Sequence, residues 1–149
     1  VSGAPSVIEF NCRFGDPETQ PIMMRLESDL AELCLAAVEH RLAAQTLSFS
    51  PKAALAVVLA SAGYPGDYDV GFPIVGLSDV QDAVVFHAGT ALQDGVLTTS
   101  GGRVLTVAAT GDSVQQAQQL AYQAVQAIQF EGRYHREDIG YRAIEREVS

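Results

Sequence analysis

The chain has 149 residues, of which 48% are hydrophobic, enough for the core of one ordinary domain or of a small domain with part of a neighbouring one. Nine basic and eighteen acidic residues give a formal charge of −9, which argues against a nucleic-acid partner because such a partner favours a basic face. The sequence contains no apolar run of the roughly 18 residues that span a bilayer and no recognisable signal peptide, so we expect a cytoplasmic protein without a membrane partner.

The first predicted element is a strand over residues 7–14, along which side chains alternate between two faces. One face is apolar and is expected to join the core; it comprises Ile8, Phe10, Cys12 and Phe14. The other face presents Glu9, Asn11 and Arg13 in a row. On a strand, Glu9 and Asn11 would stand about 7 Å apart, so their oxygens could converge on one or two small cations.

This polar face suits magnesium-dependent phosphoryl transfer. Mg2+ prefers oxygen ligands and usually takes one or two of them from protein, with water and phosphates completing its shell. Glu9 and Asn11 would supply those ligands, and Arg13 would hold phosphate oxygens and stabilise charge during transfer. A bare Glu-x-Asn pair is not diagnostic, because an edge strand with a solvated polar face would carry the same residues.

A helical region is expected after the turn signature Gly-Asp-Pro-Glu at residues 15–18. The helix can begin at residue 19 or 20 and can restart at a second cap formed by Ser28–Asp29. Its apolar stripe is expected to pack in a core and comprises Ile22, Leu26, Leu30, Leu33, Leu35, Ala37 and Val38.

The pattern changes at Ser50–Pro51, so we divide the chain into residues 1–50 and residues 51–149. Closely spaced strands are expected in the second part, over residues 53–60, 70–77, 83–90, 96–99 and 103–109. Asp94–Gly95 favours a hairpin that pairs strand 83–90 with strand 96–99. A helix capped by Asp112 or Ser113 follows, and its apolar stripe comprises Val114, Ala117, Ala121, Val125 and Ile128. The predicted fold class is α+β, with an antiparallel sheet and one helix packed on it.

Two scarce residue types limit the chemistry of the chain. Lys52 is the only lysine, so we do not expect a complete ATP site, which normally uses lysines on the phosphates. Cys12 and Cys34 offer no case for a disulfide, and both are expected to pack as small hydrophobic groups. His87, flanked by apolar residues, is interpreted as a hydrogen-bonded packing histidine rather than a catalyst.

Glycines and arginines supply the remaining candidate binding residues. Gly66 lies in loop 61–68, where glycines let the backbone approach a partner closely, although an ordinary turn explains the loop equally well. Gly101–Gly102 before Arg103 lacks the spacing of a phosphate loop and is interpreted as a turn. Four of the nine basic residues gather near the end of the chain: Arg133, Arg136, Arg142 and Arg146. In an acidic chain this cluster favours phosphate recognition, and ion pairs with neighbouring carboxylates are the alternative.

Residues 9–20, Glu-Phe-Asn-Cys-Arg-Phe-Gly-Asp-Pro-Glu-Thr-Gln, closely resemble the signature of the glycinamide ribonucleotide synthetase (phosphoribosylamine–glycine ligase) family, which are ATP-grasp enzymes of purine biosynthesis. The resemblance continues in order through residues 63–68, 87–90, 101–105 and 136–143. It implies that residues 1–50 end an ATP-grasp domain and that residues 51–149 form a small C-terminal domain. The upstream domains of the family, which bind most of the ATP, would lie outside this chain.

The family joins glycine to 5-phosphoribosylamine with ATP through a glycyl phosphate intermediate. The resemblance implies Mg2+, or Mn2+, at Glu9 and Asn11, with Arg13 as a catalytic residue. Expected substrate-binding residues are Gly15, Asp16, Pro17, Glu18, Gly66, Arg103, Arg136 and Arg142. Asp16 and Glu18 would lie on the substrate side, where a carboxylate could orient an amine, and the complete enzyme is expected to be a monomer.

Two alternatives remain open from the sequence. The chain could be a non-catalytic substrate-binding or structural domain, since residues after about 51 hold no nucleophile–base pair and no cluster of metal ligands. It could also come from a different ATP-grasp ligase, which would share Glu9 and Asn11 but not the whole block 13–18. In either case we expect this chain alone to be inactive and to bind ATP weakly or not at all.

Overall fold

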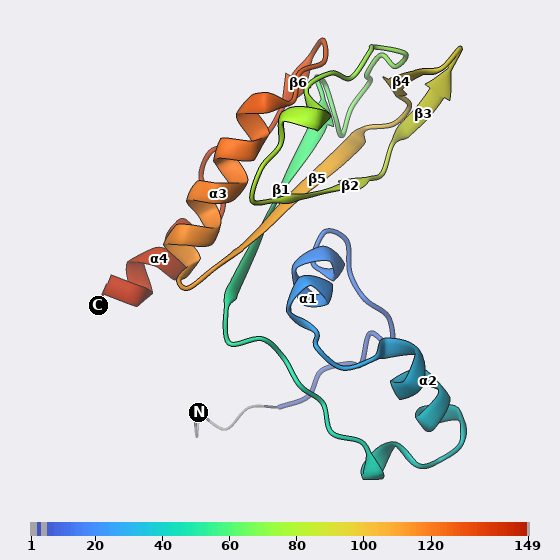
Figure 1. Cartoon of the computed structure of the whole chain (residues 1–149), viewed down its shortest axis with the longest axis vertical. Helices are drawn as coiled ribbons and strands as arrows, with labels where there is room; N and C mark the ends of the chain where they lie inside the picture. The colour runs from blue at the N-terminus through green and yellow to red at the C-terminus, as the bar shows by residue number, and fades with distance from the viewer. Residues whose placement is uncertain (1–2, 4–5, 149) are drawn as a thin grey trace.

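The computed structural model describes residue 3 and residues 6–148 (Figure 1). Among these residues, two helices come first, five strands follow, and two further helices with a sixth strand between them come last. The helices are α1 (Thr19–Arg25), α2 (Leu30–Val38), α3 (Val114–Ala127) and α4 (Tyr141–Val148), with short 3-10 turns at Leu42–Ala44 and Leu77–Asp79. The strands are β1 (Ala53–Ser61), β2 (Val84–His87), β3 (Thr90–Gln93), β4 (Val96–Thr99), β5 (Arg103–Gly111) and β6 (Arg133–Tyr134). Among the described residues, no helix combines the length and apolarity needed to cross a bilayer.

The second part of the chain, after residue 50, is built around a four-stranded antiparallel sheet in the order β2-β5-β1-β6. Its two long strands, β1 and β5, pair over almost their whole length, from Ala53 opposite Gly111 to Ala60 opposite Arg103. A separate two-stranded ribbon is formed by β3 and β4. The α+β class with an antiparallel sheet and a helix packed on it is therefore confirmed.

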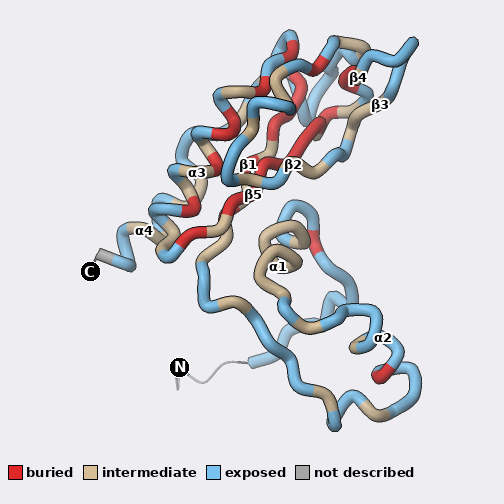
Figure 2. The backbone as a smooth tube through the Cα atoms, viewed as in Figure 1, coloured by how far each residue is buried: buried red, intermediate tan, exposed pale blue. Residues whose placement is uncertain are grey.

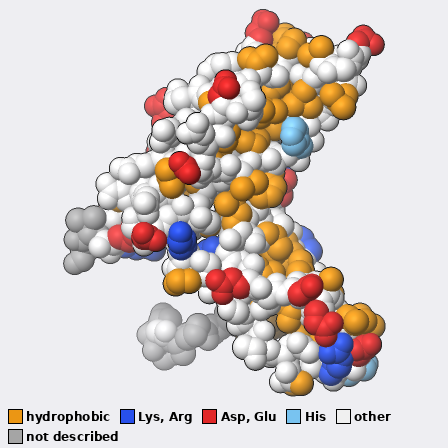
Figure 3. Space-filling view, viewed as in Figure 1, with side chains coloured by type: hydrophobic (Ala, Val, Ile, Leu, Met, Phe, Trp, Pro, Cys, Tyr) orange, Lys and Arg blue, Asp and Glu red, His pale blue; other side chains and the backbone are white. Residues whose placement is uncertain are grey.

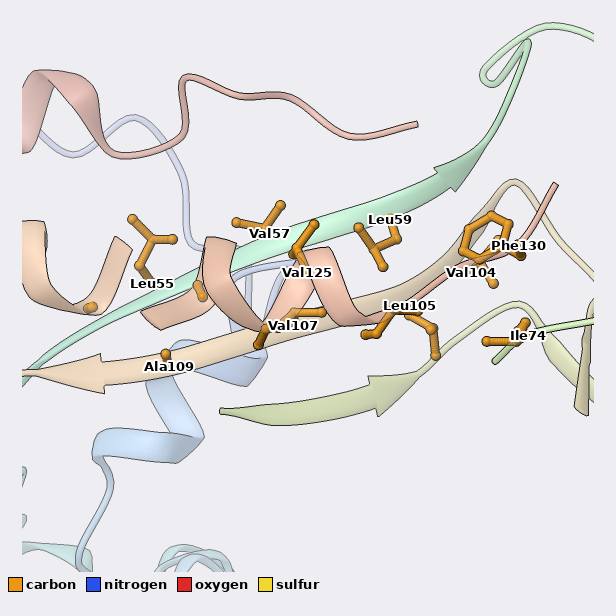
Figure 4. Close-up of a cluster of buried hydrophobic side chains, with 14 residues drawn as sticks. Leu55, Val57, Leu59, Ile74, Val104, Leu105, Val107, Ala109, Val125 and Phe130 are labelled. Carbon is orange, nitrogen blue, oxygen red and sulfur yellow. The ribbon is translucent and has the colours of Figure 1, made fainter. Parts of the chain in front are cut away.

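The hydrophobic core lies between this sheet and α3 (Figure 4). Leu55, Val57 and Leu59 alternate along β1 toward α3 and are 6%, 0% and 0% exposed, because successive side chains of a strand point to opposite faces. Among the described residues, Ala36 is the only buried hydrophobic residue that precedes Leu55. The core thus belongs almost entirely to the second part of the chain, as the burial view also shows (Figure 2).

Helix α3 begins at the predicted cap. The Ser113 hydroxyl accepts a hydrogen bond from the Gln116 amide at 3.1 Å, and the Gln116 side chain accepts one from the Asp112 amide at 2.6 Å. The first bond satisfies an amide that the first helical turn leaves without a partner, and the second ties the residue before the cap to the helix. The predicted stripe is confirmed, since Ala117, Ala121, Val125 and Ile128 are fully buried and Val114 packs partly buried at its edge.

The predicted strand over residues 7–14 is wrong: these residues form neither helix nor strand. Its expected core face is also exposed, with Ile8 at 97%, Phe10 at 82% and Phe14 at 52%. A strand requires a neighbour for its backbone hydrogen bonds, and no strand of the described residues pairs with this segment. The alternation of apolar and polar side chains in the sequence does not show whether a pairing strand is present.

The helical region splits at the predicted second cap but does not form a core. Asp29 accepts hydrogen bonds from the amides of Ala31 and Glu32, which starts α2 after a break. The stripe on α2 stays largely solvent-exposed, with Leu35 at 48% and Val38 at 77%. In the space-filling view hydrophobic side chains reach the surface around α1 and α2 (Figure 3). The burial expected for this stripe is therefore wrong.

Cys12 and Cys34 are both free, as expected, but both are exposed rather than packed. Each belongs to one of the surfaces that lack a covering element, the first in the extended segment and the second on α2. The two cysteines are exposed for the same reason as the neighbouring apolar side chains: no described element covers these surfaces.

Pairing in the second part differs from the prediction in two places. Strand β4 pairs with β3 across the Asp94–Gly95 turn, so the hairpin is confirmed but its first arm is Thr90–Gln93, while β2 pairs with β5. The chain changes partner at Gly89, whose Cα packs against Gly101 so closely that an added Cβ would lie 2.7 Å from it. Residues 70–77 form only isolated bridges, at Pro73 with Thr98 and at Val75 with Gln129, because the segment changes its partner between these two positions.

Candidate functional site

A cavity of about 280 Å3 lies on the face of β1 that points away from α3. It is lined by Pro17, Ala56, Val58, Ala60, Tyr64, Arg103, Tyr134, His135, Arg136 and Ile139. These residues come from the turn before α1, from the sheet, from the loop after β1, and from the segment between β6 and α4. Three residues proposed from the sequence as substrate-binding are therefore brought together: Pro17, Arg103 and Arg136.

The sheet register explains which side chains reach this cavity. Ala60 on β1 pairs with Arg103 on β5 and with Tyr134 on β6, so the three residues form one row across the sheet. Directly paired residues point to the same face, which places Arg103 and Tyr134 beside the cavity. Arg133, one position earlier, points the other way and donates to the carbonyls of Val125 and Ile128. Arg133 thus caps the end of α3 and does not take part in the site.

The turn before α1 is tied to the sheet by an ion pair. Arg103 Nη2 lies 2.8 Å from Asp16 Oδ2, and Nη1 donates to the Asp16 carbonyl at 3.4 Å. The pair holds Pro17 at the edge of the cavity. In the same turn the Glu18 carboxylate lies over the Cα of Gly15, so closely that a Cβ there would be 2.3 Å from it.

The segment that carries Arg136 is fixed by α3. The Tyr122 hydroxyl donates to the Arg136 carbonyl at 2.7 Å and accepts from the Ile139 amide at 3.1 Å, while the Gln118 side chain donates to the Ile139 carbonyl at 2.7 Å. Gln118 and Tyr122 are four positions apart and therefore share one side of the helix. Partial burial raises the pKa of Tyr122, so its hydroxyl remains a proton donor at neutral pH.

Arg136 makes a bidentate ion pair with Asp138, with N–O distances of 2.9 and 2.8 Å. This contact lowers the pKa of Asp138 below its ordinary value, because the guanidinium stabilises the ionised carboxylate. The Arg136 side chain is nevertheless 61% exposed, and a guanidinium has more N–H donors than this pair occupies. Arg136 can therefore hold an anion while it stays paired.

The remaining candidate residues lie outside the cavity. Arg142 stacks on the Tyr141 ring with its Cζ 5.5 Å from the ring centroid, and it lines an adjacent hollow that has Arg136 and Ile139 in common with the cavity. Gly66 closes a turn in which its amide donates to the Gly63 carbonyl at 2.7 Å. Gly102 is buried against Tyr64, where a Cβ would lie 2.1 Å from the ring. The chain bends at Gly101 and Gly102, so the predicted turn before β5 is confirmed.

Glu9 and Asn11 lie side by side although no strand holds them. Asn11 Nδ2 donates to Glu9 Oε1 at 3.3 Å, and both side chains are exposed. Among the described residues, no group of three or more histidine, cysteine or acidic side chains could hold a metal. A carboxylate next to a carboxamide still suits Mg2+, which takes one or two protein oxygens and otherwise binds water and phosphate. Arg13 follows two positions later and is also exposed.

Several residues of the site were missed from the sequence: Tyr64, Tyr122, His135 and the small residues of β1. A tyrosine four positions after Gln118, on the glutamine-rich side of α3, was the available signal for Tyr122. Burial, and then the charge of Arg133, lower the pKa of His135 below its ordinary value, so its imidazole is neutral at pH 7.

The sequence that supplies these residues matches a known protein family. A family model described as phosphoribosylglycinamide synthetase, C domain, matches residues 54–142, which include the sheet, α3 and most of the cavity. The chain belongs to this family. Within this synthetase C domain, β1, β5 and β6 supply the row of side chains described above, and α3 fixes the loop that follows β6.

The sequence similarity to known proteins extends over nearly the whole chain. Proteins named phosphoribosylamine–glycine ligase are 57% identical over 148 residues in Pseudomonas aeruginosa and 54% identical over 147 residues in Vibrio parahaemolyticus, covering 98% and 97% of this chain. A crystal structure of the phosphoribosylamine–glycine ligase of Thermotoga maritima is 34% identical, with a TM-score of 0.73 over 92% of this chain. The chain spans about a third of the length of each of these proteins, since the matched part is 34% of each one.

Proposed function

We propose that this chain is the C-terminal part of a phosphoribosylamine–glycine ligase, which acts in purine biosynthesis and joins glycine to 5-phosphoribosylamine with ATP. The observation that carries the proposal is the identity of 54–57% to proteins of that name over 97–98% of this chain. The apolar surface on residues 7–14 and on α2 supports it, because exposed apolar surface of this extent is typical of regions that another domain covers.

The same observations support a division of the chain near residue 51. We propose that residues 1–50 complete an ATP-grasp domain and that residues 51–149 form the C domain. Almost all of the described core lies in the second part, and the family match also begins there, at residue 54. Most of the ATP would then be held upstream, in agreement with the single lysine of this chain.

The proposed reaction proceeds in two steps. The glycine carboxylate attacks the γ-phosphorus of ATP, which releases ADP and forms glycyl phosphate. The amine of phosphoribosylamine then attacks the acyl carbon, a new C–N bond forms, the amine loses a proton, and phosphate leaves. A bound Mg2+, or Mn2+, offsets the charge of the ATP phosphates, and Glu9 and Asn11 would hold it.

Other residues of the chain would bind and orient the reactants. Arg13, exposed and close in sequence to the metal pair, would stabilise negative charge on the transferring phosphoryl group. Asp16 and Glu18 in the turn would orient an amine, and the backbone of Gly15, Pro17 and Gly66 would shape the approach. The exposed donors of Arg136, with Arg142 and Arg103 nearby, would recognise the phosphate of the sugar substrate.

A chimeric ligase tests the proposal. The chain replaces the corresponding C-terminal third of the Pseudomonas aeruginosa relative, and glycinamide ribonucleotide formation is measured with glycine, phosphoribosylamine and Mg-ATP. We expect turnover within about tenfold of the parent enzyme, and none from this chain alone. A soluble, folded chimera that makes no product would contradict the proposal, and one that requires a different amine or acid would favour another ATP-grasp ligase.

A further inference from the structure

The face of β1 that looks away from α3 is unusual in the size of its side chains. Ala56, Val58 and Ala60 form the floor of the cavity, whereas Leu55, Val57 and Leu59 on the opposite face fill the core. A floor of small apolar groups leaves open space above the strand, and about 280 Å3 remains there. Farther along this same face, Ala54 lines a separate hollow beside α1.

The walls of the cavity differ chemically from its floor. Arg103 and Arg136 bring two guanidinium groups to the rim, and Tyr64, Tyr134 and His135 add rings with polar ends. A ligand for such a site has a compact body with a carbon face and carries a strongly anionic group. The volume lies just below the range of roughly 300–1,000 Å3 that is typical of small-molecule sites, so it suits a sugar phosphate better than a nucleoside triphosphate.

We propose that the β1 floor receives the ribose ring of the phosphoribosylamine substrate, with the sugar phosphate at the rim near Arg136, and that the small side chain of Ala56 sets the room for the ring. This inference rests on the proposed function and adds to it the strand surface on which the sugar lies. Pro17, held by the Arg103–Asp16 ion pair, covers one side of the ring. The carbon face of a furanose can then contact the methyl groups of β1 while its polar edge faces the rim.

Filling the floor tests the proposal in the chimeric ligase. Ala56→Leu puts three additional carbons into the cavity, so we expect the KM for phosphoribosylamine to rise at least about tenfold while the KM values for ATP and glycine stay within about twofold. Ala54→Leu is the matched control, because Ala54 lies on the same strand and the same face but lines the hollow beside α1 instead. We expect Ala54→Leu to leave all three KM values within about twofold.

A nearly isosteric change covers the case in which Ala56→Leu does not fold. The background is a chimera with Cys12→Ser and Cys34→Ser, from which reactive thiols of the upstream part have also been removed. In this background, Ala56→Cys introduces one thiol on the floor of the cavity, and Ala54→Cys introduces one at the control position. Ribose 5-phosphate should slow alkylation of the thiol at position 56 at least about fivefold and leave position 54 unchanged.

The outcomes separate this inference from the proposed function. A chimera that makes product, but whose folded Ala56→Leu variant keeps a normal phosphoribosylamine KM, contradicts the inference and leaves the function intact. An alkylation rate at position 56 that ribose 5-phosphate does not change contradicts it as well, and a thiol already shielded without ligand would indicate that an upstream side chain fills the cavity. If the unsubstituted chimera makes no product, the proposed function fails and the inference fails with it.

Discussion

Arg103 and Asp16 lie 87 positions apart in the chain, and their side chains meet at 2.8 Å. The pair joins the turn that follows the proposed metal ligands to the strand that borders the cavity. It is thus a direct link between the two regions to which we assign substrate binding.

This ion pair should position the turn more than it stabilises the fold. The two side chains are 39% and 57% exposed, so solvent screens their attraction, and we expect a coupling free energy below about 1 kcal/mol. A double-mutant cycle with Asp16→Asn and Arg103→Gln, measured by denaturant unfolding, gives this quantity. The coupling should shrink further in 1 M salt, and a value above about 2 kcal/mol would show that the pair is shielded from water.

Glu9→Gln in the complete ligase should reduce turnover at least about a hundredfold, because the carboxylate charge that would hold Mg2+ is lost. The fold should survive, since Glu9 is exposed and, among the residues that the structure describes, its side chain hydrogen-bonds only with Asn11. Turnover as a function of Mg2+ concentration and the melting temperature provide the two readouts. Normal turnover at low Mg2+ would remove Glu9 from the metal site.

Arg136→Ala should raise the KM for phosphoribosylamine about ten- to a hundredfold, which corresponds to about 1.4–2.8 kcal/mol, and leave the KM for ATP within about threefold. The reason is the loss of exposed donors that would bind the sugar phosphate. Arg41→Ala is the control, since Arg41 is also exposed and paired, with Glu32 at 2.9 Å. If Arg136 serves only its ion pair with Asp138, both KM values will stay unchanged in the folded variant.

Tyr122→Phe removes the hydroxyl that bonds the Arg136 carbonyl and the Ile139 amide. We expect a loss of about 1–2 kcal/mol in the free energy of unfolding, because two backbone groups lose a common partner. In the complete ligase the phosphoribosylamine KM should also rise, by about threefold or more, while kcat changes less, since the segment carrying Arg136 is less well fixed. A drop in stability with no change in KM would limit Tyr122 to a structural role.

His135 should make the stability of the chain depend on pH below about 6.5. Its pKa is lowered in the folded chain, mainly by burial, whereas in the unfolded chain it titrates near its ordinary value of 6.5. The unfolded state therefore binds the proton first as the pH falls, and the folded state loses stability through the window below 6.5. Denaturant unfolding at pH 7.5 and 5.5 should show a smaller difference for His135→Asn than for the unsubstituted chain.

The control for this pH effect is His40→Asn, because His40 is exposed and its φ of 57° is one that asparagine tolerates. We expect His40→Asn to keep the full pH dependence of the unsubstituted chain. An equal reduction in both variants would assign the effect to histidine content in general rather than to the environment of His135.

Local sequence patterns were sufficient to predict the elements that depend only on residues close together in the chain. The apolar run of β1, the cap at Ser113 and the stripe of α3 all depend on spacing within a few residues, and all three were predicted correctly. Glu9 and Asn11 lie close together as expected, although the strand from which their proximity was predicted does not form.

Pairing between distant segments was decided only by the tertiary structure. Residues 7–14 have the alternation of a strand but lack a paired strand among the described residues, and their apolar side chains remain exposed. The cavity exists because the register sets Arg103 and Tyr134 on either side of Ala60, and because Tyr122 fixes the loop that carries Arg136. A register shift of one residue would turn these side chains to the other face, and no local pattern in the sequence specifies that register.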